Sequence, residues 1–400
     1  MHDDSRRLDS PRDESLLRVL FVVHQRMERV TGVSAATLAL GNALETRGHQ
    51  VSYYGFNDAF GAQTRGGIPE MLRFPWHAAR DLSRVAASYH MIDASTGDGW
   101  VWGSLGRPGG RHTALVTRSH GLEHVHAADL RRRARIGRLR LSMEYSLYHG
   151  GFRLWEVAQS LRVADAQVFL NHADRCHAIQ RLGVRPSTAV VLPNGISEDA
   201  LTSAPPAIST SDRPIELAFI GPWIPRKGAG AVVEMAQALS TRNVPFRLRL
   251  LGTGAPDAMV LGSFDDASRP RVSIVREFAP GTLPTLLEGA AVLLHPSWTE
   301  GFSLALVEGM AAGLAPVATR CGGATTVIQH ERSGLLLANE SGEFLARAVE
   351  KLAGDVELLA RMRGEARQNV QAHRWDTIAE RTVDVYRSAI ARRTRATPAA

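Results

Sequence analysis

Short apolar runs separated by longer mixed stretches dominate the first half of the chain. Val19 to Val23 is a valine-rich run typical of a buried parallel strand, and an Ala- and Leu-rich stretch follows it and ends at Arg47-Gly48. Glycine in this position ends a helix. Another apolar run begins at Val51, so the pattern predicts the strand, helix and strand of a βαβ unit, as in doubly wound sheets.

The same pattern repeats in both halves of the chain. Helices are expected from about Gly228, from about Ser303 and from Trp375. Strands besides the first are expected at 51–54, 114–117, 166–170, 189–192, 216–220, 247–251, 272–275 and 291–295. Strands that alternate with helices in this way predict an α/β protein with two Rossmann-like sheets.

The domain division follows from length and from one change in composition. A chain of 400 residues favours two domains, and residues 197–213 are rich in Ser, Thr, Pro and Ala, as linkers are. We therefore expect an N-terminal domain at 16–196, a linker at 197–213, a C-terminal domain at 214–374 and a final helix at 375–395.

Composition narrows the class of protein. With 44% hydrophobic and 22% charged residues, the chain is typical of a folded globular protein. Its apolar stretches are shorter than the ~20 residues that span a bilayer, and the acids near its start do not fit a secretory leader. Cys176 and Cys321 suggest neither a disulfide framework nor a thiolate zinc site, so a cytoplasmic location is expected. The net charge of +7 is compatible with nucleic acid, anionic lipid or phosphorylated ligands.

Two glutamates mark the most informative segment. Glu300 follows the strand that ends near His295, and Glu308 lies in the helix that Ser303 is expected to cap. Eight residues at 1.5 Å each would separate the two carboxylates by ~12 Å, about the length of a nucleotide sugar. One carboxylate could then meet the sugar and the other the ribose, with helix-start amides facing a diphosphate. The alternative, a solvated Glu308, fits poorly beside Val307 in a small-residue helix.

This segment resembles the E-x7-E pair of the family-four retaining glycosyltransferases with the GT-B architecture. The resemblance extends along nearly the whole chain. Its other matches, in chain order, are Thr31-Gly32, Arg47-Gly48-His49, Ala164-Asp165-Ala166, Leu192-Pro193-Asn194-Gly195, Phe219-Ile220-Gly221, Arg226-Lys227-Gly228, Leu251-Gly252-Thr253-Gly254, Pro316-Val317, Gly322-Gly323, Ser333-Gly334-Leu335 and the Trp375 to Tyr386 helix.

The resemblance implies both an architecture and a reaction. Two Rossmann-like domains would face each other across a cleft, the N-terminal one binding the acceptor and the C-terminal one the donor, and the last helix would cross back to the N-terminal domain. The implied enzyme is a retaining hexosyltransferase that needs no metal or cofactor. It would move a sugar from a nucleotide-sugar donor to a hydroxyl acceptor in glycan, glycolipid or polysaccharide biosynthesis.

The resemblance also assigns roles to individual residues. Lys227 and Arg226 would hold the donor diphosphate, Glu308 the ribose and Glu300 the sugar. His120 would close over the donor from the other domain, together with the Thr31-Gly32 loop. The expected catalytic residues are thus His120, Glu300, Arg226 and Lys227, and the expected donor-binding residues are Gly32, Glu308, Gly301, Phe302, Ser303 and Leu304.

Two positions depart from the family pattern. Pro222 stands where an arginine usually follows the glycine, so Arg226 is the candidate replacement beside Lys227, one of only two lysines in the chain. Thr325-Thr326 stand where the family usually has Pro-Glu, so a donor or interdomain contact is expected to differ. The chain has no GxGxxG and no GxxxxGK[ST], which counts against dehydrogenases and P-loop proteins.

His120, Glu123 and His124 also match the H-x-x-E-H pattern of zinc peptidases. That chemistry needs both histidines on one helix face, and Gly121 makes a helix from His120 a poor expectation. A third alternative is that both are core histidines with structural partners.

An arginine-rich run lies in the N-terminal half. Residues 131–140 hold six arginines and are followed by Leu141, Met143 and Leu147. The run could contact an anionic membrane and bring the enzyme to a lipid-linked acceptor at the inner face of the membrane, or form a solvated helix face. It lacks interleaved aromatics, so nucleic acid is not expected. The remaining alternatives are a nucleotide-sugar epimerase or hydrolase of the same architecture, or a basic protein without enzymatic activity that binds membrane or nucleic acid.

Overall fold

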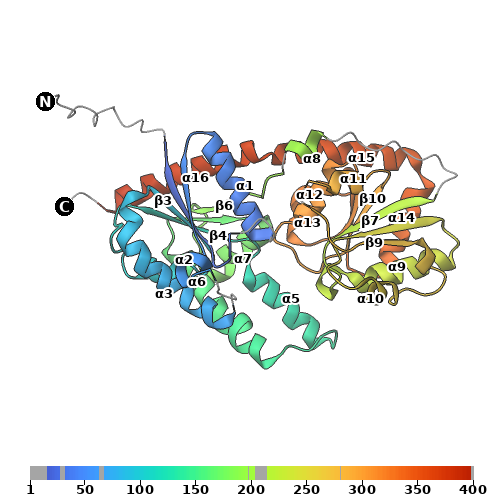
Figure 1. The fold of residues 1–400 in the computed structure, drawn as a ribbon, viewed down its shortest axis with the longest axis horizontal. Helices are drawn as coiled ribbons and strands as arrows, with labels where there is room; N and C mark the ends of the chain where they lie inside the picture. Colours follow the sequence, from blue (N-terminus) through green and yellow to red (C-terminus); the bar gives the residue numbers. More distant parts are fainter. Residues whose placement is uncertain are drawn as a thin grey trace.

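The computed structural model describes residues 16–27, 32–62, 67–196, 198–202, 214–279 and 281–397. These residues form two α/β units that lie side by side along the long axis of the molecule (Figure 1). Each unit is built on a six-stranded sheet in which every neighbouring pair of strands is parallel. The expected fold class, with two Rossmann-like sheets, is therefore confirmed. Among the described residues no helix is long and apolar enough to cross a membrane.

The first sheet has the strand order β2-β1-β3-β4-β5-β6. Its strands are β1 (Arg18–Val22), β2 (Gln50–Tyr54), β3 (Met91–Ser95), β4 (Ala114–Arg118), β5 (Ala166–Phe169) and β6 (Ala189–Val191). Its helices are α1 (Gly32–Thr46), α2 (Phe56–Phe60), α3 (Ile68–Val85), η1 (Ala86–Ser88), α4 (Trp100–Ser104), α5 (Glu123–Arg135), the π-helix η2 (Tyr145–Phe152), α6 (Arg153–Val163) and α7 (His172–Leu182). The helix that was expected to end at Gly48 ends at Thr46, two residues before that glycine.

The second sheet has the order β12-β11-β10-β7-β8-β9. Its strands are β7 (Ile215–Ile220), β8 (Phe246–Leu251), β9 (Val272–Val275), β10 (Val292–His295), β11 (Ala315–Thr319) and β12 (Leu335–Leu337). Its helices are η3 (Pro225–Lys227), α9 (Ala229–Thr241), α10 (Asp257–Leu261), η4 (Arg269–Arg271), α11 (Leu283–Leu286), α12 (Leu304–Ala311), α13 (Gly322–Val327), α14 (Gly342–Gly354) and α15 (Val356–Val370).

The structure contains three strands and one short helix that the sequence pattern did not predict. All nine predicted strands are present, and the three additional strands are β3, β11 and β12. Within the expected linker, α8 (Glu198–Thr202) is helical, and its Leu201 is buried in the core of the second unit. The rest of that linker, residues 197 and 203–213, lies outside the described residues, as does Thr31.

The chain passes between the two units twice. Ile196 leaves the first unit and its amide donates to the carbonyl of His373, which returns through η5 (Gln371–His373). Helix α16 (Trp375–Ala396) then runs back along the first unit, as expected (Figure 1). Its apolar face joins the core beneath β1 and β4, and the buried Tyr386 hydroxyl donates to Asp93 on β3 at 2.6 Å.

Candidate active site

The strand order of each sheet indicates where a ligand would bind. In an open parallel sheet, ligands bind beyond the carboxyl ends of the strands where the winding direction reverses. In the first sheet this reversal lies between β1 and β3, and in the second between β7 and β10. The residues that follow these four strands are therefore the place to look for chemistry.

Glu300, Lys227 and Arg226 meet at the reversal point of the second sheet. The Lys227 Nζ donates to Glu300 Oε1 at 2.6 Å, and Arg226 Nη1 lies 3.4 Å from the same oxygen. Burial alone would raise the pKa of Glu300, but the charge of Lys227, with that of Arg226 beside it, holds the pKa below its ordinary value. The carboxylate is therefore ionised at neutral pH between two cations.

Arg226 thus lies beside Lys227 in space as well as in sequence, although Pro222 occupies the usual arginine position. Its guanidinium is more exposed than the Lys227 ammonium, with 38% against 14% of the side chain accessible. The exposed part of Arg226 is free to meet a second anion. At the other departure, the Thr325 and Thr326 hydroxyls bond to the carbonyls of Cys321 and Gly322, so no carboxylate acts there.

Two buried polar groups beside this pair were not predicted from the sequence. His295 ends β10, and burial together with Lys227 lowers its pKa to about 4. His295 Nε2 and the Ser297 hydroxyl are buried without a hydrogen-bond partner. Buried polar groups are normally satisfied, so two unsatisfied ones close to one ion pair suggest a ligand that completes them.

Glu308 lies in α12, and Ser303 caps this helix as expected, accepting from the Leu306 amide. The Glu308 carboxylate is partly buried, which raises its pKa, and it makes no hydrogen bond or ion pair with any described residue. Of the other expected donor-binding residues, Phe302 is buried and Leu304 is half-buried. A partly buried carboxylate without a partner fits a ligand contact better than a solvated face.

The loops that carry His120 and Glu300 touch each other across the two units. Gly301 packs so closely on the backbone of His120 and Gly121 that a Cβ at Gly301 would come within 3.0 Å of both. Beside it, the Asn171 amide donates to the Gly301 carbonyl at 2.8 Å. Burial, Arg118 and His24 lower the pKa of His120 to about 3, so its ring is neutral, and Nδ1 has no partner.

The zinc-peptidase alternative is not formed. Helix α5 begins at Glu123, so His120 and His124 do not share a helix. In the described ranges, no group of three His, Cys, Asp or Glu side chains is placed to hold a metal ion. Gly32 starts α1, and among the described residues a Cβ there would meet no atom within 4 Å.

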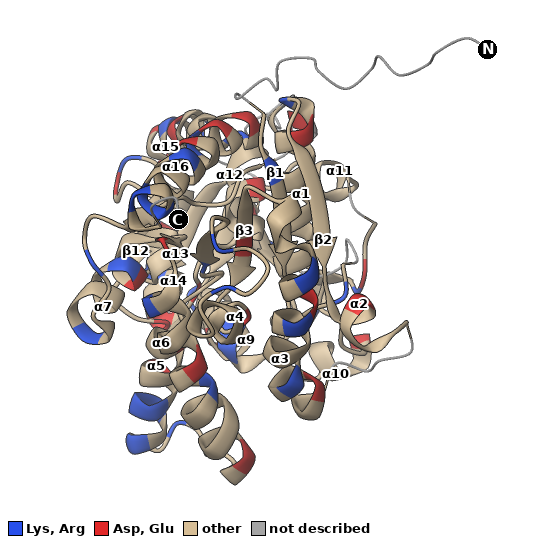
Figure 2. Cartoon of the chain, turned by 90° about the vertical axis from the view of Figure 1, so that its left-hand side faces the viewer, with Lys and Arg blue, Asp and Glu red and all other residues tan. Residues whose placement is uncertain are grey.

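The arginine-rich run colours part of α5 and the segment after it blue in Figure 2. Its side chains are divided between internal contacts and solvent. Arg133, only 2% exposed, pairs with Asp129 at 2.6 Å and reaches Glu340 of the second unit at 2.5 Å. Its guanidinium also lies 4.1 Å from the ring centre of Trp298, two residues before Glu300. Arg133 therefore joins the first unit to the loop that carries Glu300, a contact that counting residues along the run could not reveal.

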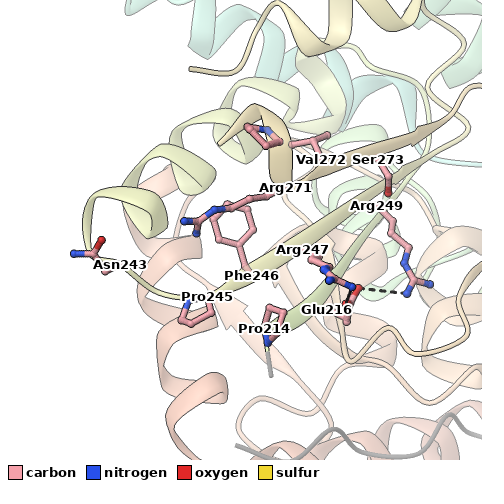
Figure 3. A pocket seen from close by; sticks show the side chains of 11 residues that line it. Pro214, Glu216, Asn243, Pro245, Phe246, Arg247, Arg249, Arg271, Val272 and Ser273 are labelled. Atoms are coloured by element: carbon pink, nitrogen blue, oxygen red, sulfur yellow. Dashed lines mark hydrogen bonds and ion pairs between the residues drawn. The ribbon is translucent and has the colours of Figure 1, made fainter. Parts of the chain in front are cut away.

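The pocket drawn in Figure 3 lies away from Glu300, Lys227 and Arg226. It encloses about 560 Å³ at the amino ends of β7, β8 and β9, the edge opposite Glu300. Its guanidinium groups already have partners in the chain: Arg249 and Arg247 pair with Glu216, and Arg271 bonds to the Val244 carbonyl. We do not assign donor binding to this pocket.

Comparison with known proteins defines the class. Residues 30–200 match the family described as Glycosyltransferase Family 4, and residues 214–355 match Glycosyl transferases group 1. The two matched regions coincide with the two sheets and together span most of the chain. Both sheets therefore lie in regions that match glycosyltransferase families, and the first of these regions matches family four.

Among curated relatives, the D-inositol 3-phosphate glycosyltransferase of Streptomyces griseus is 30% identical over 182 residues, which are 43% of this chain and 39% of the relative. The chain matches about half or less of the length of the first relatives, 56% and 39%. Two solved structures share the fold. Sucrose-phosphate synthase from Thermosynechococcus elongatus has a TM-score of 0.72 at 18% identity, covering 94% of this chain and 99% of that one. Anabaena HepE in complex with UDP and glucose has a TM-score of 0.65 at 17% identity, covering 92% and 98%.

Proposed function

We propose that the protein transfers a sugar from a nucleotide-sugar donor to a hydroxyl acceptor, with retention at the anomeric carbon. The observation that carries the proposal is the partly buried Lys227–Glu300–Arg226 group, packed through Gly301 against His120 of the other unit. HepE, which shares the fold, was solved with UDP and glucose, so a UDP-sugar is the first donor to test. The biological setting we propose is glycan, glycolipid or polysaccharide synthesis.

The proposed site acts mainly through charge. A departing nucleoside diphosphate gains negative charge, which fixed cations in a partly buried site stabilise without a metal. Lys227 is held in place by its bond to Glu300, and Arg226 offers its exposed face to the same diphosphate. Neutral His120 can hydrogen-bond a donor hydroxyl through the unpartnered Nδ1. Glu308, in the helix α12 that follows Glu300, is proposed to hold the ribose.

The ribose assignment predicts a difference between two glutamates. Glu308→Gln should weaken binding of both UDP and the UDP-sugar, because the loss of charged hydrogen bonds costs ~1.5 to 3 kcal/mol. Glu300→Gln should leave UDP binding intact or strengthen it, because it frees Lys227 and Arg226 from their internal anion. Titration calorimetry with UDP, GDP, ADP and their sugars measures both effects and identifies the base.

Both variants keep the shape of the side chain, so a common loss of stability is not expected. Glu365→Gln, in α15, is a suitable control because among the described residues the half-exposed Glu365 carboxylate pairs with Arg332 at the surface, away from the site. If Glu300→Gln abolished UDP binding while Glu308→Gln did not, the ribose and sugar ends would be assigned the wrong way round.

We propose further that the enzyme works in the cytoplasm at an anionic membrane surface. Arg132, Arg135 and Arg140 are exposed around the end of α5, and Met143 and Leu147 just beyond them are 79% and 70% exposed. Arginines near such a surface contribute ~1 kcal/mol each, and exposed apolar side chains add to the attraction. The acceptor would then be lipid-linked or held close to the membrane.

Flotation with phosphatidylglycerol vesicles tests this contact. The wild type should float at low salt and be released at high salt, because screening shortens the attraction to ~3 Å at about 1 M. Changing Arg132, Arg135 and Arg140 to Ser should reduce flotation while sparing Arg133. Changing the exposed Arg181, Arg361 and Arg395 to Ser removes the same charge elsewhere. Equal losses for both triple variants would reject a specific docking surface.

Neither alternative class is favoured by the comparisons. The family matches on both halves describe glycosyltransferases rather than epimerases or proteins that bind nucleic acid. Turnover of the sugar nucleotide that does not depend on any acceptor would favour a hydrolase over the proposed transferase.

A further inference from the structure

The Arg133 side chain belongs to the first unit but is buried against two separate points of the second. It lies in the last turn of α5 and is 2% exposed. Its guanidinium lies 4.1 Å from the ring centre of Trp298, which follows β10, and its Nη1 donates at 2.5 Å to Glu340, which follows β12. Asp129, one turn earlier in α5, accepts from its Nε at 2.6 Å and fixes the direction of the side chain.

Neither of these two acids depends on Arg133 alone. Asp129 also pairs with Arg132 at 2.7 Å, and Glu340 also pairs with Arg138 at 2.9 Å. Burial would raise the pKa of Glu340, but the bond from Arg133 and the charge of Arg138 hold the pKa below its ordinary value. Each carboxylate would therefore keep a base if Arg133 were replaced. What Arg133 adds to this group is its aromatic contact.

Trp298 connects that contact to the proposed diphosphate-binding group. It lies two positions before Glu300, and its backbone amide donates to the Arg226 carbonyl at 2.9 Å. Arg226 Nη1 in turn lies 3.4 Å from Glu300 Oε1. On the other side of the same loop, Gly301 packs on the backbone of His120, just before α5. The first unit therefore contacts this loop on both sides of Glu300.

The contact between Arg133 and Trp298 is suited to holding the indole ring in place. A guanidinium is attracted to the face of an indole, and the attraction is larger where water is excluded, as it is around a side chain that is 2% exposed. The Trp298 ring is only partly buried. Without the guanidinium one face of this ring would lose its cover, and the ring, its loop and the attached Arg226 carbonyl could shift.

We propose that Arg133 is a positioning residue, which stacks on Trp298 and thereby holds Arg226 at the β-phosphate of the donor. The proposal rests on the proposed transferase function. The sugar of a nucleotide sugar is attached to the β-phosphate, and Arg226 lies beside Glu300, the residue proposed to hold that sugar. Arg133 touches no substrate in this account. It acts through the ring of Trp298 and the backbone bond that follows from it.

Calorimetry with UDP and UMP tests this role, because the two nucleotides differ by the β-phosphate. Arg133→Met should weaken UDP binding about tenfold, the order that one charge-assisted hydrogen bond contributes, and change UMP binding less than about twofold. A merely structural role predicts that both nucleotides are affected alike. Arg181→Met, at an exposed arginine in the last turn of α7, is the control and should change neither affinity. Unchanged UDP binding, or equal weakening of UDP and UMP, overturns the proposal.

Variants of Trp298 test the route and do not require Arg133→Met to fold. Trp298→Leu removes the ring but keeps the backbone amide and the ion pairs of Arg133, so it should lose UDP affinity to the same extent. Trp298→Phe keeps an aromatic face and should retain most of the affinity. UDP affinity as high in Trp298→Leu as in the wild type would reject the route.

The double variant separates positioning from the direct effect of the Arg133 charge. If Arg133 acts through Trp298, combining Arg133→Met with Trp298→Leu should cost no more UDP affinity than either change alone. Losses that multiply would show that the two side chains act independently and would overturn the proposal. A wild type that binds none of UDP, GDP and ADP would count against the transferase function instead.

Discussion

Lys227→Ala should lower kcat by about 100-fold or more, the usual cost of removing one electrostatic stabiliser of charge in the transition state. Two changes act together. The departing diphosphate loses its most buried cation, and Glu300, only 10% exposed, keeps only the more distant Arg226 as a partner at 3.4 Å. Steady-state kinetics with a UDP-sugar and a hydroxyl acceptor would measure the effect.

The chain offers a matched control, since it contains one other lysine. Lys351 is 51% exposed and pairs at the surface with Glu331, so Lys351→Ala should leave kcat unchanged. EDTA should have little effect on the wild type, because the proposed charge stabilisation needs no metal. Activity that is lost on chelation and restored by a divalent ion would contradict this account of Lys227.

Gly301→Ala should reduce kcat/KM by about 100-fold, the order of loss that follows a misplacement of ~1 Å between reacting groups. The added Cβ would lie within 3.0 Å of the backbone of His120 and Gly121, and backbone does not give way as a flexible side chain does. The two loops must separate, which moves Glu300 away from the groups of the first unit.

The effect should be on activity more than on folding. UDP binding should persist, because Lys227, Arg226 and Glu308 all lie in the second unit. Gly364→Ala in α15 is the control, since a Cβ there meets no atom within 4 Å. Wild-type activity in Gly301→Ala would show that the contact between the two loops is not needed for transfer.

Much of the fold could be predicted from apolar runs, and the strands that were missed have clear physical reasons. Strand β3 contains Asp93, whose buried charge is met by Arg118 at 2.7 Å and by Tyr386, which lies 293 positions away in sequence. Strand β11 contains Pro316, which ordinarily argues against an interior strand. Strand β12 has only three residues. Local patterns could not show the distant partners that make these segments strands.

The residues of the candidate site likewise fall into two groups, those that a sequence motif predicts and those that depend on contacts between distant parts of the chain. Glu300, Lys227 and Glu308 were predicted because they occur in a spaced motif, and the fold brings the first two into contact. Arg133 looked like one of six equivalent arginines, and its contacts with Glu340 and Trp298 depend on how the two units sit together.

Helix α16 affects how the protein is made. Its apolar face completes the core beneath β1 and β4, and its Tyr386 meets Asp93, yet the ribosome produces it after the whole second unit. At about 5 to 20 residues per second, translation from β3 to α16 takes on the order of 15 to 60 s. During that interval the core residues of the first unit that α16 covers in the folded chain lack this cover. The two units therefore cannot be exchanged as separate modules unless α16 travels with the first.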